Sequence, residues 1–169
     1  MIDLNTTVIN GKPYFLWSNY DFVGNISHEI FCEIGVPDLW SDGTPKVISF
    51  IVAPYENGLA ATTRPVECSV GGISLPGGKV EQGEHPVNGI LREAHEEGWH
   101  INKDDLRSHF FARLVNKRLA LWFFAKNAIK LTSFKEEHRI KQIVAIPDEV
   151  AKHFNNFEPV MIAKARSWI

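Results

Sequence analysis

A short stretch near the middle of the chain gathers glutamates at helical spacing. Glu96 and Glu97 follow Glu93 by three and four residues, so a helix would place all three carboxylates on one face. Like charges at this spacing destabilise an isolated helix by about 0.2–0.5 kcal/mol per pair. Carboxylate oxygens are hard ligands of the kind that Mg²⁺ and Mn²⁺ prefer. The pattern therefore indicates a divalent-metal site, and the alternative is a solvated acidic helix face.

The residues that precede this helix favour the metal site. Pro76-Gly77-Gly78 predicts a sharp turn, and glycine there lets the backbone approach an ion or a ligand closely. His85-Pro86 then places a proline at a plausible first helical position. An apolar stripe beside the carboxylates predicts the side of the helix that packs on the core, with Val87, Ile90, Leu91 and Ala94.

This stretch resembles the Nudix box, the signature of the Nudix hydrolases. That pattern is Gly, five residues, Glu, seven residues, then Arg-Glu-small or apolar-any-Glu-Glu-any-Gly-apolar, and it is matched by Gly78, Glu84, Arg92, Glu93, Ala94, Glu96 and Glu97. One departure is plain, because Trp99 stands where the pattern has glycine and His100 takes the apolar place. Gly98, one residue earlier, can still end the helix in a left-handed conformation. The departure concerns the exit of the helix rather than the metal ligands.

The resemblance implies hydrolytic attack on phosphorus in a diphosphate linkage, with Mg²⁺ or Mn²⁺ as cofactor. Divalent ions neutralise such a linkage, position it and lower the pKa of a bound water. The implied metal ligands are the backbone carbonyl of Gly77 and the carboxylates of Glu93, Glu96 and Glu97. Glu93 is a ligand or the base that activates water, and the family differs in which glutamate is the base.

Further along the chain, Glu137 is the candidate for a fourth carboxylate ligand or base, with Glu136 less favoured. The alternative for this pair is a solvated turn. Arg92 is interpreted as orienting Glu93 through a charge-assisted hydrogen bond, and Glu84 as bracing the loop against the helix. Two cations are candidates for phosphate contacts or for ordinary solvated positions, namely Arg64 and Lys79.

The last third of the chain shows a weaker resemblance to the MutT-like subgroup, in Leu119–Phe124, Phe154 and Glu158–Lys164. In that subgroup an asparagine just before a Glu-Pro pair reads the purine edge. Here Phe157 stands at that place, directly after Asn155 and Asn156. An amide suits a purine edge because it offers a donor and an acceptor together. The resemblance favours a nucleoside triphosphate, cleaved to a nucleoside monophosphate and pyrophosphate.

Two alternatives remain open. Within the same enzyme class, the substrate is ADP-ribose, NADH or a dinucleoside polyphosphate. From another class, the chain is a non-catalytic nucleotide-binding regulatory module, as some Nudix domains are. Such modules often lose carboxylates of the box, whereas all of them are present here. Hydrolysis in the presence of Mg²⁺ discriminates between the two classes.

The order of predicted elements indicates an α+β fold, and the resemblance implies the α/β/α sandwich of the Nudix fold, with a mixed sheet between helices. A single domain is expected over residues 1–169, with residues 1–45 as a β-rich N-terminal extension packed on it. Asn10-Gly11 and Asn116-Lys117 are the predicted hairpin turns. Predicted strands cover residues 7–9, 14–17, 30–34, 46–53, 59–64, 73–75, 110–115, 119–125 and 142–146, and predicted helices start near residues 86, 147 and 158.

Composition excludes several classes of protein. The net charge of −2 gives no bulk attraction to nucleic acid or to an anionic membrane. The longest apolar run, Val47–Ala53, is too short to span a bilayer. Cys32 and Cys68 form neither a disulfide framework nor a zinc pattern, and no signal peptide is evident. We therefore expect a cytoplasmic monomer or homodimer whose partner is a nucleotide, with no nucleic acid and no membrane involved.

Overall fold

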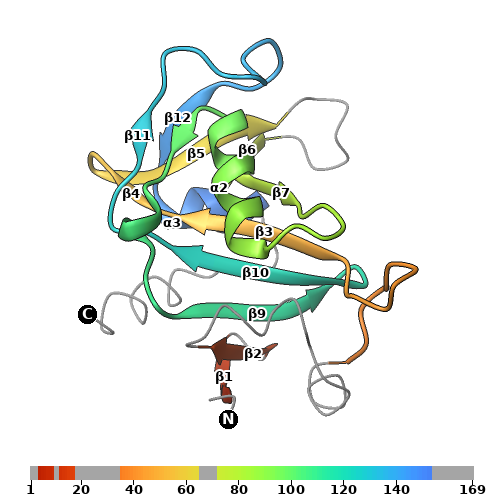
Figure 1. Cartoon of the computed structure of the whole chain (residues 1–169). Helices are drawn as coiled ribbons and strands as arrows, with labels where there is room; N and C mark the ends of the chain where they lie inside the picture. The colour runs from red at the N-terminus through yellow and green to blue at the C-terminus, as the bar shows by residue number, and fades with distance from the viewer. Residues whose placement is uncertain (1–3, 10–11, 18–34, 65–71, 154–169) are drawn as a thin grey trace.

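The computed structural model describes residues 4–9, 12–17, 35–64 and 72–153 of the 169-residue chain. Its long helix stands against a strongly twisted mixed sheet, and a short helix lies on the other side (Figure 1). The elements are β1 (Leu4–Ile9), β2 (Lys12–Trp17), β3 (Val47–Val52), β4 (Pro54–Tyr55), β5 (Gly58–Arg64), β6 (Gly72–Ser74), β7 (Gly77–Lys79), α2 (Pro86–Glu96), β8 (Trp99–His100), η2 (Lys103–Asp105), β9 (Phe110–Val115), β10 (Arg118–Phe124), β11 (Ile129–Lys130), β12 (Gln142–Ala145) and α3 (Pro147–His153).

The strands form one large sheet, a smaller sheet and a two-stranded ribbon. The large sheet has the order β1-β2-β9-β10-β3-β7, in which β10 and β3 are parallel and the other pairs are antiparallel. The smaller sheet has the order β12-β5-β4, with β6 pairing to β5. The ribbon joins β8 to β11. The mixed sheet that the sequence predicts is therefore present.

Both faces of the central strands are buried, because successive side chains of a strand point to opposite faces. In β10, Leu119, Leu121 and Phe123 pack with α2, whereas Trp122 and Phe124 pack in the cluster that contains Val150 of α3. Strands buried on both faces read as continuous apolar runs. This explains why β3 and β10 are the most apolar segments of the sequence. The three layers are α2, the sheet and α3.

Most predicted strands are confirmed, including both hairpins. β1 and β2 flank Asn10-Gly11, and β2 pairs with β9, so this N-terminal hairpin extends the large sheet. Asn116 and Lys117 have φ of 48° and 63°, the left-handed values that a tight two-residue hairpin turn needs. The strand predicted at residues 30–34 and the helix predicted from residue 158 lie outside the described residues. Among the helices of the described part, none is long and apolar enough to cross a membrane.

Trp99, the residue that departs from the box pattern, is a core residue. Its side chain is 0% exposed, its indole Nε1 donates to the Ala61 carbonyl at 3.0 Å, and Tyr55 contacts its ring edge-on. The left-handed helix exit is made by Gly98 instead, with φ of 96°, as the sequence predicts. A Cβ at Gly98 would lie 2.5 Å from Gln142 Nε2, so the position is also sterically closed.

Replacing Trp99 with the glycine of the box pattern should therefore destabilise the protein. Trp99→Gly removes a fully buried ring and its hydrogen bond to the Ala61 carbonyl. The expected loss in the free energy of unfolding is about 3–5 kcal/mol. Urea denaturation measures this loss. The matched control is Trp40→Gly, where a partly exposed ring lies 4.9 Å from Lys46 Nζ in a cation–π pair and the expected loss is about 1 kcal/mol. Equal losses in the two variants would contradict the structural role of Trp99.

Candidate active site

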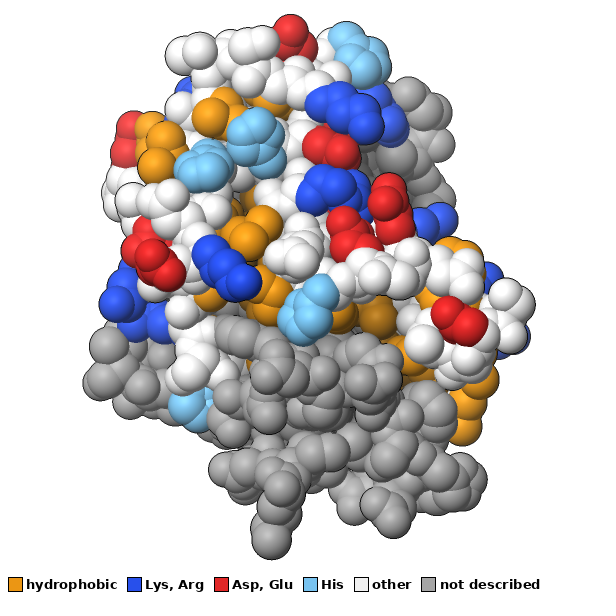
Figure 2. Space-filling view, viewed as in Figure 1, with side chains coloured by type: hydrophobic (Ala, Val, Ile, Leu, Met, Phe, Trp, Pro, Cys, Tyr) orange, Lys and Arg blue, Asp and Glu red, His pale blue; other side chains and the backbone are white. Residues whose placement is uncertain are grey.

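The local sequence explains where α2 begins and which side it buries. Pro86 occupies the first turn, and the Nδ1 atom of His85 accepts a hydrogen bond from the Val87 N–H at 3.1 Å. A proline needs no partner at this position because it carries no N–H. Val87, Ile90 and Ala94 are buried in the core, whereas the glutamates lie on the adjoining face. In Figure 2 acidic and basic side chains alternate over the upper right of the molecule.

Arg92 is the cation at the centre of this acidic cluster. Its Nε and Nη2 atoms donate to the two carboxylate oxygens of Glu84 at 2.8 and 3.0 Å. Its Nη1 atom lies 3.1 Å from Glu93 Oε1 and 3.3 Å from Glu96 Oε2, and Nη2 also donates to the Lys79 carbonyl at 3.2 Å. The hydrogen bond with Glu84 is the main cause that raises the pKa of Arg92 above its ordinary value. Through Glu84, Arg92 thus joins the loop after β7 to the helix, and it also makes the contact with Glu93 that the sequence predicts.

Glu93 is held against the glycine turn. Burial raises the pKa of its carboxyl group, against the opposing charge of Arg92, and the negative charges of Glu96 and Glu84 raise it further. A Cβ at Gly78 would lie 2.5 Å from Glu93 Oε2, so a larger residue there would displace this carboxylate. A crowded carboxylate with a raised pKa is the kind of group found at catalytic and metal sites.

Glu97 joins the end of the helix to the same turn. Its Oε1 atom accepts a hydrogen bond from the Gly77 N–H at 2.7 Å. A Cβ at Gly77 would clash with the Ser49 carbonyl of β3, so the close approach of β7 to β3 at this point requires glycine. Gly77 and Glu97 are 20 residues apart in the sequence. The structure therefore brings the glycine turn and the carboxylates of the box together.

The segment before β12 lies against the C-terminal end of α2. The Glu136 N–H donates to the Glu96 carbonyl at 2.9 Å, and Lys135 Nζ lies 3.3 Å from Glu96 Oε1. The carboxylate of Glu136 pairs with Arg139 at 3.4 Å. Glu137 is exposed, and its carboxylate accepts a bond from the Phe134 N–H at 3.4 Å within its own turn. The segment thus meets the helix end through the backbone of Glu136 and the side chain of Lys135, and neither role that we predict for Glu137 is tested by these contacts.

The donor set suits a divalent cation, although cations of the protein itself now contact it. Within the described residues, no group of three or more His, Cys, Asp or Glu side chains is arranged to hold a metal ion. Arg92 contacts the carboxylates of Glu93 and Glu96, and Lys135 contacts that of Glu96. Carboxylates that crowd a glycine turn, where a Cβ would leave no space, still offer the hard oxygens that Mg²⁺ or Mn²⁺ prefers. An ion at this site would have to compete with those two side chains.

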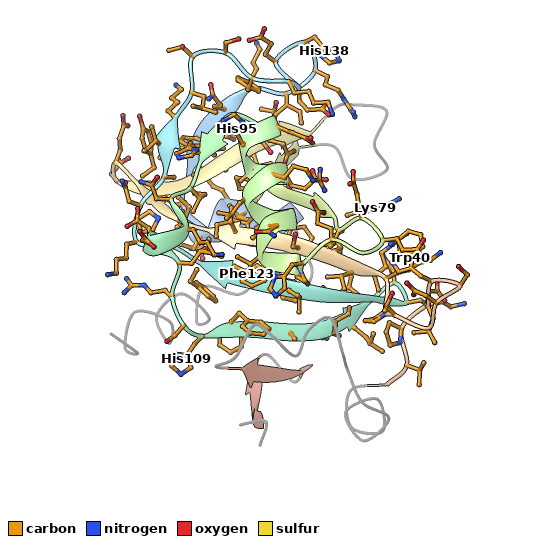
Figure 3. The ribbon with its side chains drawn as sticks, viewed as in Figure 1. Trp40, Lys79, His95, His109, Phe123 and His138 are labelled. Carbon is orange, nitrogen blue, oxygen red and sulfur yellow. The ribbon has the colours of Figure 1, made fainter. Side chains whose placement is uncertain are left out.

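The predicted substrate contacts are only partly covered by the described residues. Lys79 is exposed at the end of β7, beside α2 (Figure 3). Arg64 is the last residue of β5, where it pairs with Gly72, and its side chain is outside the described part. The candidates for base recognition, Asn155, Asn156 and Phe157, are outside it as well.

Sequence reasoning missed two polar residues of the helix exit. Gln142 of β12 donates through Nε2 to the Gly98 and Leu131 carbonyls at 2.6 and 2.7 Å. Lys135 supplies the second cation at Glu96, although its side chain is 70% exposed. Both contacts join segments about forty residues apart, and no local pattern in the sequence marks either of them.

Solved structures of similar fold carry the name Nudix. Neither a protein-family model nor a curated protein matches the sequence. A putative Nudix hydrolase from Chromobacterium violaceum is 22% identical, with 76% of this chain and 82% of that one covered at a TM-score of 0.50. A Nudix hydrolase from Nitrosomonas europaea is 16% identical, with 98% and 86% covered at 0.50. An ADP compounds hydrolase is 13% identical, with 99% and 92% covered at 0.51. The chain therefore has the Nudix fold, which confirms the predicted α+β class.

The ion pair between Glu84 and Arg92 gives a pH-dependent prediction. The hydrogen bond from Arg92 holds the pKa of Glu84 below its ordinary value, so the charged carboxylate stabilises the fold above that value. This contribution is lost as the pH falls through the pKa of the folded state. Glu84→Gln should lower the free energy of unfolding by about 1–2 kcal/mol at pH 7, and the difference from the unchanged protein should close below about pH 4.

Urea denaturation between pH 3 and pH 8 in the presence of a chelator measures this difference. Glu93→Gln is the contrasting variant, because burial raises the pKa of Glu93 and the charged form is disfavoured in the fold. That variant should not lose stability at pH 7. A loss in Glu84→Gln that stays constant down to pH 3 would contradict the ion pair as its cause.

Proposed function

We propose that this protein is a divalent-metal-dependent Nudix pyrophosphohydrolase that cleaves the diphosphate linkage of a nucleoside diphosphate joined to another moiety. The observation that carries the proposal is the meeting of the glycine turn with the box carboxylates. Glu97 Oε1 accepts a hydrogen bond from the Gly77 N–H at 2.7 Å, and the Glu93 carboxylate packs so closely on Gly78 that a Cβ there would lie 2.5 Å from Oε2. Together with the Nudix fold, this geometry matches the chemistry that the residues of the box predict.

The residues have separate roles in this proposal. Glu93, Glu96 and Glu97, with the Gly77 carbonyl, would hold Mg²⁺ or Mn²⁺, and Glu137 is the candidate for a further carboxylate. The ion supplies neutralisation of the diphosphate and an activated water. Arg92 positions Glu93 through the 3.1 Å ion pair, which leaves Glu93 as a ligand or as the general base.

For the substrate we favour a nucleoside triphosphate, cleaved to a nucleoside monophosphate and pyrophosphate. The MutT-like pattern near Asn155 and Asn156 supports this choice, with Arg64 and Lys79 as candidate phosphate contacts. The second candidate is an ADP-linked compound such as ADP-ribose. It is included because the ADP compounds hydrolase shares the fold over 99% of this chain.

The test is phosphate or pyrophosphate release from a nucleotide panel with Mg²⁺ and with Mn²⁺. The panel holds canonical-base and oxidised nucleoside triphosphates, ADP-ribose, NADH and dinucleoside polyphosphates. Turnover of at least one member is expected. Binding without turnover, in a folded protein loaded with metal, would instead favour the non-catalytic regulatory module.

Glu97→Gln should lower turnover at least about a hundredfold, because it removes a charge that the metal ion needs. Glutamine keeps a side-chain oxygen that can accept the Gly77 N–H, so the fold should persist. The matched control is Glu81→Gln in the loop before α2, where the side chain is exposed and the backbone N–H and carbonyl make the contacts with Glu84. Full activity in a folded Glu97→Gln variant would overturn the assignment of the site.

A further inference from the structure

A cavity of about 510 Å³ lies at the opposite end of α2 from the carboxylates. It is open to solvent on one side and lies between the first turn of the helix and the segment that leads from η2 to β9. Its lining residues are His85, Val87, Asn88, Lys103, Leu106, Arg107 and Ser108. In the middle of the face drawn in Figure 2, hydrophobic atoms lie between basic and histidine side chains. The volume is in the range of small-molecule sites in proteins, about 300–1,000 Å³.

The charge of this cavity is positive. Lys103 and Arg107 line it, and within the described residues neither side chain forms an ion pair. The nearest acidic neighbours in sequence, Asp104 and Asp105, are not among its lining residues. Two cations that face one cavity repel each other, and an anion between them would remove that repulsion.

The remaining lining residues add donors and an apolar floor. Asn88 and Ser108 are exposed polar side chains, whereas Val87 and Leu106 supply hydrophobic surface. His85 accepts the Val87 N–H through Nδ1, so neutral His85 carries its proton on Nε2 and can donate to a ligand. That bond also occupies the Val87 N–H, so the side chains, rather than the helix terminus, supply the attraction for an anion.

We propose that this cavity is a second ligand site, which binds a small phosphomonoester through Lys103 and Arg107 and packs its apolar part on Val87 and Leu106. A phosphate group suits the site because it carries up to two negative charges and accepts several hydrogen bonds at once. The site is distinct from the proposed metal ligands, since none of them lines it and Glu93, the first of them on the helix, follows Val87 by six residues, about 9 Å along the helix axis. The proposal does not depend on the catalytic function.

The experiment measures binding of inorganic phosphate and of phenyl phosphate to the full chain, by calorimetry and by amide chemical-shift changes, in the presence of a chelator. Phenyl phosphate should bind at least tenfold more tightly than inorganic phosphate, because its ring reaches the apolar floor. Shift changes should gather at residues 85–88 and 103–108. Arg107→Glu combined with Lys103→Glu should weaken binding at least tenfold.

The control is Lys130→Glu, which reverses an exposed cation on β11 and should leave binding unchanged. Arg107→Gln is a milder variant in case the double charge reversal fails to fold. Glu97→Gln should bind phenyl phosphate normally, which separates this site from the proposed active site. Absence of binding, equal affinity for the two probes, or binding that survives in Arg107→Gln and in the double variant would overturn the proposal. So would binding that is lost in Glu97→Gln.

Discussion

The guanidinium of Arg92 is the interaction on which the candidate active site depends. Three glutamates and one backbone carbonyl surround it, and without a cation these carboxylates would repel one another on a half-buried surface. Arg92 satisfies the geometry with two parallel bonds to Glu84, a pairing that lysine could not reproduce. Arg92 therefore fixes the helix to the end of β7 and to the loop that follows it, and the bond between Glu97 and the Gly77 N–H adds the glycine turn.

The sequence predicts this part of the molecule well because its determinants are local. Helical spacing places Glu93 and Glu96 together, the His85-Pro86 pair marks the start of α2, and Gly98 marks its end. The two hairpins are equally local, since Asn10-Gly11 and Asn116-Lys117 define their own turns. In each case residues within a few positions of one another decide the conformation, and no knowledge of the rest of the chain is needed.

Contacts between distant segments could not be predicted in the same way. The box pattern alone does not reveal that Trp99 fills the core beneath β5, because its partner Ala61 is 38 positions away. The pairing of β12 with β5 likewise sets two other contacts, the ion pair of Lys135 with Glu96 and the hydrogen bond from Gln142 to the Gly98 carbonyl. The cavity beside Lys103 and Arg107 arises where two segments fail to fill the space between them, which no spacing of residues encodes.

The parallel pairing of β3 with β10 also has a consequence for the order in which the chain assembles. Strands β3 and β7 form one unit across residues 53–76, which include β4, β5 and β6, and strands β9 and β10 form a second unit across the two-residue turn Asn116-Lys117. Joining the two units requires closure of a loop of about seventy residues, from Val47 to Leu119, and such closure is entropically costly and slow. The glutamates of α2 travel with the first unit, whereas Lys135 follows the second unit in the chain. The acidic cluster can therefore meet Arg92 within the first unit, whereas the contact of Lys135 with Glu96 depends on the pairing of β12 with β5.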